Sequence, residues 1–238
     1  AGVVNMMSLS TRFNESCRYL GQCRHDGVFG DIYYARARSV RRSGIPNWNL
    51  GFIQAGGGAF RDMGVHALDA VWWIIGMPRP VSVLGVAGAK FGPYGKGFWN
   101  YQVPDPEFYS KYDSDDYAGG FIRFENGLGL QIESFWASHQ KEEFQIEIFG
   151  TEAGATYSPL QLFSTRHGMP HDTAVKIPSV APSPWQNIAD HFIEAILDGT
   201  PCQAPLRHGL IVQQMMEALL ESARDGKAVD LEKRITWS

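Results

Sequence analysis

The chain has 238 residues, of which 44% are hydrophobic and 19% charged, so it holds enough apolar material for a folded core and too much for a disordered segment. Its formal charge of -4 is spread along the chain without basic blocks, which excludes nucleic-acid binding through the phosphate backbone and a polybasic membrane anchor. No apolar run is long enough for a membrane span, and three cysteines without metal-type spacing favour a reducing, cytoplasmic location.

The first part of the chain alternates between predicted helices and strands. An extended segment over 3–13 leads into a short helix over 15–26. Aromatic and β-branched residues mixed with arginines predict a strand over 32–40 with one solvated face. After a loop and three consecutive glycines, apolar residues at helical spacing predict a helix over 59–75.

The remainder of the chain predicts a series of strands followed by two helices. An Asn-Gly turn between two β-rich runs, 117–124 and 128–137, is a strong hairpin signal. The other expected elements are a strand over 81–91, a long aromatic loop over 92–112, strands over 143–149, 155–164 and 173–177, and helices from 185 to Gly199 and from 210 to Gly226. This order predicts one α+β domain over 1–238, with an open-faced, mainly antiparallel sheet and helices packed on one face.

The segment that points to chemistry lies at the start of the helix after the three glycines. Asp62 and His66 are four residues apart and Asp69 is three further on, so all three can share one helix face. A carboxylate can hold an imidazole tautomer and bind a substrate hydroxyl, while the imidazole can move a proton near neutral pH. We also expect the glycines to leave amide donors free at the helix start.

A structural role for this pair stays open, since an Asp and a His four apart on a helix are also common as a surface pair or a cap. No metal site is expected, because the remaining histidines show no ligand spacing beyond His167 and His171. The chain has no Gly-x-Gly-x-x-Gly fingerprint, no Walker loop and no nucleophile elbow. We therefore expect no dinucleotide to bind to this chain alone.

Several motifs together resemble the C-terminal domain of the Gfo/Idh/MocA family, the glucose-fructose oxidoreductase and inositol dehydrogenase group of NAD(P)-dependent sugar and polyol enzymes. They are Thr11-Arg12-Phe13, Gly44-Ile-Pro, the glycine-rich run into Asp62-Met-Gly-Val-His66-Ala-Leu-Asp69, Phe121-Ile-Arg-Phe-Glu-Asn-Gly127 and the tail from Ile188 to Pro201. The resemblance implies an N-terminal Rossmann domain in the intact protein, with NAD or NADP bound there, and a homo-oligomer formed through the sheet face. It also implies that the 238 residues are a fragment.

By the same resemblance, His66 has the position of the proton-transferring base and Asp62 that of the carboxylate that binds the sugar hydroxyl. Arg12 and Trp48 are further candidates for the site, Arg12 at its cofactor-facing end and Trp48 for stacking on a sugar ring. A solvent-exposed charge at a strand end explains Arg12 equally well, and ordinary packing is the favoured explanation for Trp48. Trp136 and His139 can face either the same pocket or a subunit contact, because strand alternation does not fix the face without a register. Asp69 is included among the substrate-binding candidates.

Three functions are compatible with the sequence. The first is the substrate-binding and dimerisation half of a nicotinamide-dependent sugar or polyol dehydrogenase. The second is a relative that performs lyase, hydrolase or metal-assisted sugar chemistry on the same scaffold. The third is a non-catalytic sugar-binding or assembly module.

Overall fold

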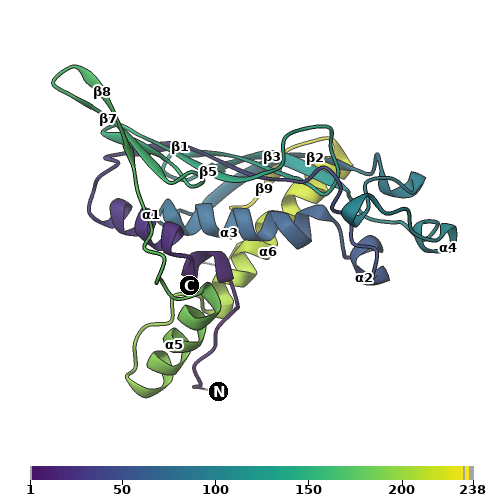
Figure 1. Ribbon diagram of the computed structural model, residues 1–238, viewed down its shortest axis with the longest axis horizontal. Coiled ribbons are helices and arrows are strands. Elements are labelled where there is room, and N and C mark those ends of the chain that lie inside the picture. Colours follow the sequence, from purple (N-terminus) through teal and green to yellow (C-terminus); the bar gives the residue numbers. More distant parts are fainter. Residues whose placement is uncertain (1, 233, 236–238) are drawn as a thin grey trace.

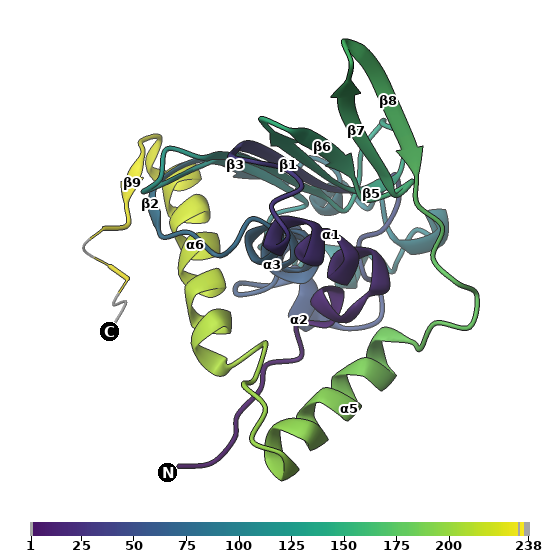
Figure 2. The ribbon, with the colours of Figure 1, turned by 90° about the vertical axis from the view of Figure 1, so that its left-hand side faces the viewer.

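The protein is described by a computed structural model that covers residues 2–232 and 234–235, and its main feature is a nine-stranded sheet with helices on one face (Figures 1 and 2). The strand order is β8-β7-β6-β5-β1-β4-β3-β2-β9, in which β1 runs parallel to β4 and every other pairing is antiparallel. The predicted α+β class is confirmed.

The elements follow one another as a meander with helices inserted. The strands are β1 (Ile32–Val40), β2 (Pro80–Gly88), β3 (Tyr117–Phe124), β4 (Gly129–Phe135), β5 (Glu143–Gly150), β6 (Ala153–Thr156), β7 (Gln161–Arg166), β8 (Met169–Ala174) and β9 (Val229–Asp230). The helices are α1 (Glu15–His25), α2 (Leu50–Ile53), α3 (Val65–Ile74), α4 (Pro106–Tyr109), α5 (Pro184–Leu197) and α6 (Leu206–Asp225), with 3-10 turns at Ser10–Phe13, Gly92–Tyr94 and Trp99–Tyr101 and a π-helical turn at Phe60–Gly64. None of the helices in the described part of the chain is long and apolar enough to cross a membrane.

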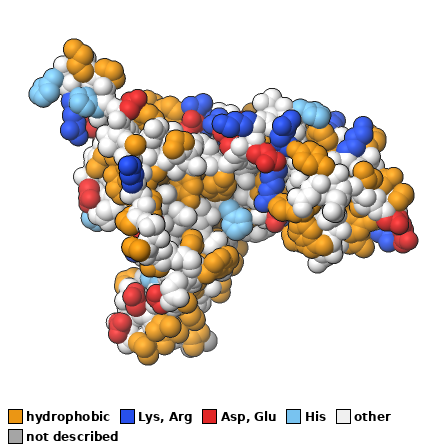
Figure 3. Space-filling model, in the orientation of Figure 1, with side chains coloured by type: hydrophobic (Ala, Val, Ile, Leu, Met, Phe, Trp, Pro, Cys, Tyr) orange, Lys and Arg blue, Asp and Glu red, His pale blue; other side chains and the backbone are white. Residues whose placement is uncertain are grey.

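Helix α3 lies at the centre of the helical layer. It contacts α1, α6 and the inner face of β1, and seven of its ten residues are buried. Because apolar neighbours surround it on most sides, its sequence is hydrophobic nearly all round, as expected of a core helix. Helix α5 instead projects away from the sheet, and hydrophobic side chains gather over it and over the lobe that carries α2 and α4 (Figure 3). At the N-terminal end of α3, His66 is exposed, so this end of the core helix reaches solvent.

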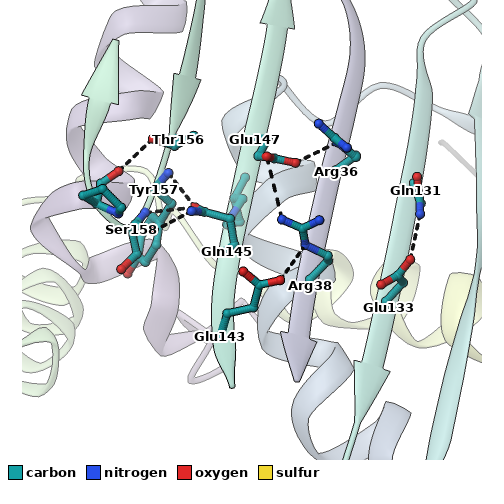
Figure 4. Close-up of polar contacts among 12 residues, drawn as sticks. Arg36, Arg38, Gln131, Glu133, Glu143, Gln145, Glu147, Thr156, Tyr157 and Ser158 are labelled. Carbon is teal, nitrogen blue, oxygen red and sulfur yellow. Dashed lines mark hydrogen bonds and ion pairs between the residues drawn. The ribbon is translucent and has the colours of Figure 1, made fainter. Parts of the chain in front are cut away.

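The outer face of the sheet, opposite the helices, is half charged and half apolar. On β1, Ala35 and Ala37 point to the core, while Arg36 pairs with Glu147 at 2.7 Å and Arg38 pairs with Glu143 at 3.0 Å (Figure 4). The arginines predict that one face of this strand is solvated. In the structure, ion pairs with the neighbouring strand cover that face.

Toward β2 and β3 the same outer face becomes apolar. Leu84 and Val86 are 55% and 63% exposed, and with Tyr117, Phe121 and Phe135 they line a hollow of about 660 Å³. We call this set of five side chains the apolar patch.

The structure differs from the sequence expectations at several places. The long loop expected over 92–112 contains α4 and two 3-10 turns. The segment 3–13 ends in a 3-10 turn instead of remaining extended. The strands expected over 155–164 and 173–177 form as β6, β7 and β8 with other bounds, because they are short and β8 is exposed at every residue, so no burial pattern marks their ends. The helix expected over 59–75 begins with the π-helical turn before α3.

Candidate functional site

The π-helical turn that precedes α3 is held at its start by Asp115. The carboxylate Oδ2 of Asp115 accepts a hydrogen bond from the Phe60 N–H at 2.9 Å, and its main-chain oxygen accepts one from the Ala59 N–H at 2.9 Å. Gly58 has a φ of +108°, and a β-carbon there would lie 2.0 Å from Oδ1 of Asp115. Only glycine therefore allows this close approach.

The Gly57 and Gly58 amides at this helix start are not free, contrary to the expectation from the glycines. The Gly57 N–H donates to the Gln54 carbonyl at 2.9 Å, and the Gly58 N–H donates to the Phe52 carbonyl at 2.8 Å. Since the next two amides donate to Asp115, the glycines serve a tight internal turn. They do not form a cradle for the pyrophosphate of a dinucleotide, which needs unpaired amide donors. That this chain alone has no affinity for NAD(H) stays a prediction, which calorimetry tests.

His66 is exposed and stands between two cavities. The first cavity, about 450 Å³, lies between the ends of β1 and β5, the Ser10–Phe13 turn and the start of α5. The second cavity, about 440 Å³, lies between α2, the glycine turn and the π-helical turn, and it is lined by Asp62 as well as His66. The structure therefore places Asp62 and His66 together at a solvent-accessible position, as the spacing predicts.

The Asp62 carboxylate is anchored from the sheet. Its Oδ2 accepts a hydrogen bond from the indole N–H of Trp136 at 2.8 Å. Trp136, which follows β4, has no exposed surface, whereas Asp62 is half-buried. The indole thus contacts Asp62, which lines the second cavity, and itself lines neither cavity.

Arg12 and Asp69 meet each other in the core. Both side chains are fully buried, and the guanidinium Nε donates to Asp69 Oδ2 at 2.9 Å. Asp69 therefore points away from the face that it was expected to share with His66, and neither residue reaches the cavities. Sequence reasoning did not find this pair, because 57 residues separate its members.

Trp48 and His139 both pack against aromatic side chains. Trp48 is 59% exposed and meets Trp99 and Phe52 edge to face at 5.7 and 5.9 Å. His139 is exposed and packs on Phe91 at 5.4 Å between ring centroids. Of these, Phe52 lines the second cavity, and Trp48 and His139 do not.

The first cavity contains residues that the sequence did not single out. Its polar side chains include Asn14, Ser39 and Arg41, and its aromatic ones include Tyr157 and Trp185. Burial raises the pKa of Tyr157 to about 12, so its hydroxyl keeps its proton and can donate a hydrogen bond. These residues come from four separate segments, so only the tertiary fold brings them together.

Among the residues that the structure describes, no group of three His, Cys, Asp or Glu side chains is arranged to hold a metal ion.

Comparisons of the sequence and the fold with known proteins point to the same family of enzymes. The GFO/IDH/MocA C-terminal domain matches residues 18–156. The chain is 31% identical over 233 residues to the D-glucoside 3-dehydrogenase of Escherichia coli (strain K12), which covers 92% of this chain and 62% of that protein. It is 26% identical over 253 residues to the D-apiose dehydrogenase of Paraburkholderia graminis, which covers 97% of this chain and 60% of that protein. The chain thus spans less than two thirds of these relatives.

Solved structures share the fold. A levoglucosan dehydrogenase in complex with NADH and levoglucosan superposes with a TM-score of 0.77 at 21% identity, over 97% of this chain and 66% of that one. An aldose-aldose oxidoreductase from Caulobacter crescentus, complexed with glycerol, gives 0.74 at 22% identity, over 97% and 64%. Since the domain match covers more than half of the chain, this protein belongs to the GFO/IDH/MocA family and contains its C-terminal domain.

Proposed function

We propose that this chain is the substrate-binding and proton-transferring part of an NAD(P)-dependent sugar or polyol dehydrogenase, with His66 as the base and Asp62 as its neighbouring carboxylate. The observation that carries the proposal is the exposed imidazole between two cavities, with an anchored carboxylate on the preceding turn. An exposed surface pair with no cavity on either side would not support it.

The chemistry requires two transfers from one carbinol group. A carbinol carbon loses a hydride easily only when its hydroxyl proton leaves as well, and a positioned base typically contributes about 10²- to 10⁴-fold to the rate. A bound nicotinamide would supply the hydride acceptor, and in this proposal a part of the protein outside the 238 residues holds it. Asp62 accepts a hydrogen bond from the substrate hydroxyl, and His66 takes the proton.

The lining of the first cavity, which includes His66, favours a sugar. Exposed aromatic faces such as Trp185, 66% exposed, provide an apolar surface for the carbon-bound hydrogens of a pyranose ring, while Asn14, Ser39 and Arg41 offer donors and acceptors for its hydroxyls. The D-glucoside 3-dehydrogenase among the relatives makes a glucoside the first substrate to test.

The apolar patch supports a second part of the proposal, that the outer sheet face contacts another copy of the chain. Solvent-exposed apolar patches of this kind usually mark an interaction surface. The charged half of the same face, with paired arginines and glutamates, provides the polar rim of such a contact.

The experiment uses the full-length protein that contains this chain, assayed with NAD+ or NADP+ and a D-glucoside. We expect His66→Ala to lower kcat by about 10²-fold or more with little change in KM, because a base acts mainly in the transition state. Asp62→Asn should change both constants, because Asp62 also holds the bound substrate. The acidic limb of the pH profile of kcat/KM should disappear or move in the His66 variant.

The matched control is His171→Ala, which removes an exposed histidine on β8 far from the cavities. It should keep the kinetic constants of the unmodified protein. A His66→Ala variant with near-normal kcat and an unchanged pH profile would remove His66 from the mechanism, and the base would then have to lie outside this chain.

A further inference from the structure

Trp136 is joined to the candidate site by one hydrogen bond. Its indole N–H donates to Asp62 Oδ2 at 2.8 Å, and its side chain has no exposed surface. A substrate cannot touch a side chain without exposed surface, so any effect of Trp136 on the reaction must pass through the residues that it contacts, of which Asp62 accepts its side-chain hydrogen bond.

The indole is itself held firmly. The Trp136 main-chain N–H donates to the Asp116 carbonyl at 2.9 Å, and the Trp136 carbonyl accepts from the Gly44 N–H at 2.8 Å. Its ring packs in a small core that includes Ile45 and Phe98. Because backbone and ring are both fixed, the N–H points at one place in space.

The same strand end also holds the backbone that carries Asp62. Two residues before Trp136, the Ser134 hydroxyl donates to the Ala59 carbonyl at 2.9 Å, at the start of the π-helical turn. The end of β4 and the residue after it therefore bind the turn at two points. Ser134 binds the main chain of the turn at Ala59, and Trp136 binds the Asp62 carboxylate. π-helical turns such as this one are rare, and they occur often at functional sites.

We propose that Trp136 is a positioning residue, which fixes the orientation of the Asp62 carboxylate so that its other oxygen, Oδ1, faces the substrate hydroxyl. This inference rests on the proposed function of Asp62. Without the indole N–H the carboxylate rotates freely about its terminal torsion, and the fraction of molecules with the productive orientation falls.

The test is Trp136→Phe in the full-length protein, which deletes the N–H donor. We expect kcat/KM for the glucoside to fall about 10- to 100-fold, the range for loss of a hydrogen bond to a charged group. Both kcat and KM should change, as they do for a residue that acts through a substrate-holding carboxylate. The control is Trp72→Phe, which also deletes a buried indole N–H, here bonded to the Pro78 carbonyl at 2.9 Å. It should lower thermal stability to a similar extent and change kcat/KM less than about 3-fold.

A double-mutant cycle separates positioning from structural damage. In an Asp62→Ala background, Trp136→Phe should cost less than about 3-fold, because the group that it positions is already absent. An equal loss in both backgrounds would overturn the proposal, since Trp136 would then act independently of Asp62. Replacing Trp136 with the isosteric benzothienylalanine, which keeps the ring shape and lacks the donor, should reproduce the loss, and full activity of that variant would also overturn the proposal.

Asp62→Asn and Trp136→Phe together distinguish an error in the positioning role of Trp136 from an error in the proposed function of Asp62. If Asp62→Asn retains normal activity, the proposed function of Asp62 is wrong and this inference falls with it. If Asp62→Asn is impaired while Trp136→Phe is normal, only the positioning role is wrong. The Trp136 indole ¹⁵N–¹H resonance gives a check without turnover, because it should move in Asp62→Asn and stay unchanged in Glu221→Gln, which alters a carboxylate on α6 paired with Arg234.

Discussion

Arg12 is a buried guanidinium whose partners come from three segments of the chain. It donates to Asp69 on α3, to the carbonyl of Gln203 at 2.7 Å, and to Nδ1 of His208 at 2.9 Å. A guanidinium has no acceptor, so Nδ1 must accept, and His208 is neutral with its proton on Nε2. Burial and the charge of Arg12 lower the pKa of His208 to about 4.

This network makes stability depend on pH. The unfolded chain protonates His208 near pH 6.5 and the folded chain only near pH 4, so the stabilisation is complete above pH 6.5 and is lost as the pH falls between these values. Because His208 is only about half-buried, we discount the effect to about 1 to 2 kcal/mol. His208→Gln keeps an acceptor for Arg12 but cannot be protonated. Between pH 7 and 4.5 this variant should therefore lose about 1 to 2 kcal/mol less of its free energy of unfolding than the unmodified chain. Urea denaturation at the two pH values measures it.

The matched control for this measurement is His25→Gln, because the His25 side chain is 74% exposed. It should leave the pH dependence of the unfolding free energy unchanged. An identical pH dependence in His208→Gln and the unmodified chain would contradict the assignment of a neutral, accepting His208.

Single residues also show what sequence alone can predict about the site. Asp62 and His66 could be paired from their spacing, because a helix fixes the geometry of neighbours four apart. For Trp136 the sequence leaves open whether it faces the pocket or a subunit contact, because the face of its strand depends on the register and 74 residues separate it from Asp62. Arg12 and Asp69 look like site residues in a motif, and only burial shows that they pair with each other.

At the scale of elements, the entry to α3 is a turn in which the glycines differ in what a side chain would meet. Gly56 and Gly58 both have positive φ, +92° and +108°, but a β-carbon at Gly56 would meet nothing within 4 Å. A β-carbon at Gly58 would collide with Asp115 and displace the carboxylate that holds the turn. An alanine at Gly56 therefore tests backbone strain alone, whereas an alanine at Gly58 adds the loss of the Asp115 contacts.

We expect Gly56→Ala to lower the free energy of unfolding by about 1 kcal/mol, the strain of a left-handed residue. Gly58→Ala should lower it by about 3 kcal/mol, because the strain adds to the loss of buried hydrogen bonds to Asp115. Chemical denaturation of both variants measures the difference. Equal losses for the two would mean that Asp115 does not hold the turn.

The elements that were predicted well are those with strong local signals. The β3–β4 hairpin follows from its Asn-Gly turn, and α1, β1, α5 and α6 follow from periodicity and glycine stops. The parallel pairing of β1 with β4 could not be predicted, because it joins residues about 95 positions apart and leaves no local pattern. The π-helical turn likewise has no sequence signature that distinguishes it from the first turn of an α-helix.

At the scale of the whole molecule, the outer sheet face should govern self-association. We expect the chain to form an oligomer at about 50 µM, and Val86→Asp to shift it toward monomer, because a charge in the centre of a buried contact lacks a partner. Light scattering measures the mass. Val103→Asp changes a more exposed valine, 75% exposed on the long loop, and should leave the mass unchanged. A monomeric unmodified chain would contradict the proposed contact.

The central position of β1 also determines how the chain can fold. Its neighbours β4 and β5 follow it by 95 residues (Tyr34 to Gly129) and 115 residues (Tyr34 to Phe149). Such non-local pairing has high contact order, so we expect folding in milliseconds to seconds instead of microseconds. During synthesis at about 5 to 20 residues per second, β1 waits on the order of 5 to 20 s for β4. In that interval Arg36 and Arg38 place charge within an unpaired strand, which disfavours pairing with other nascent chains.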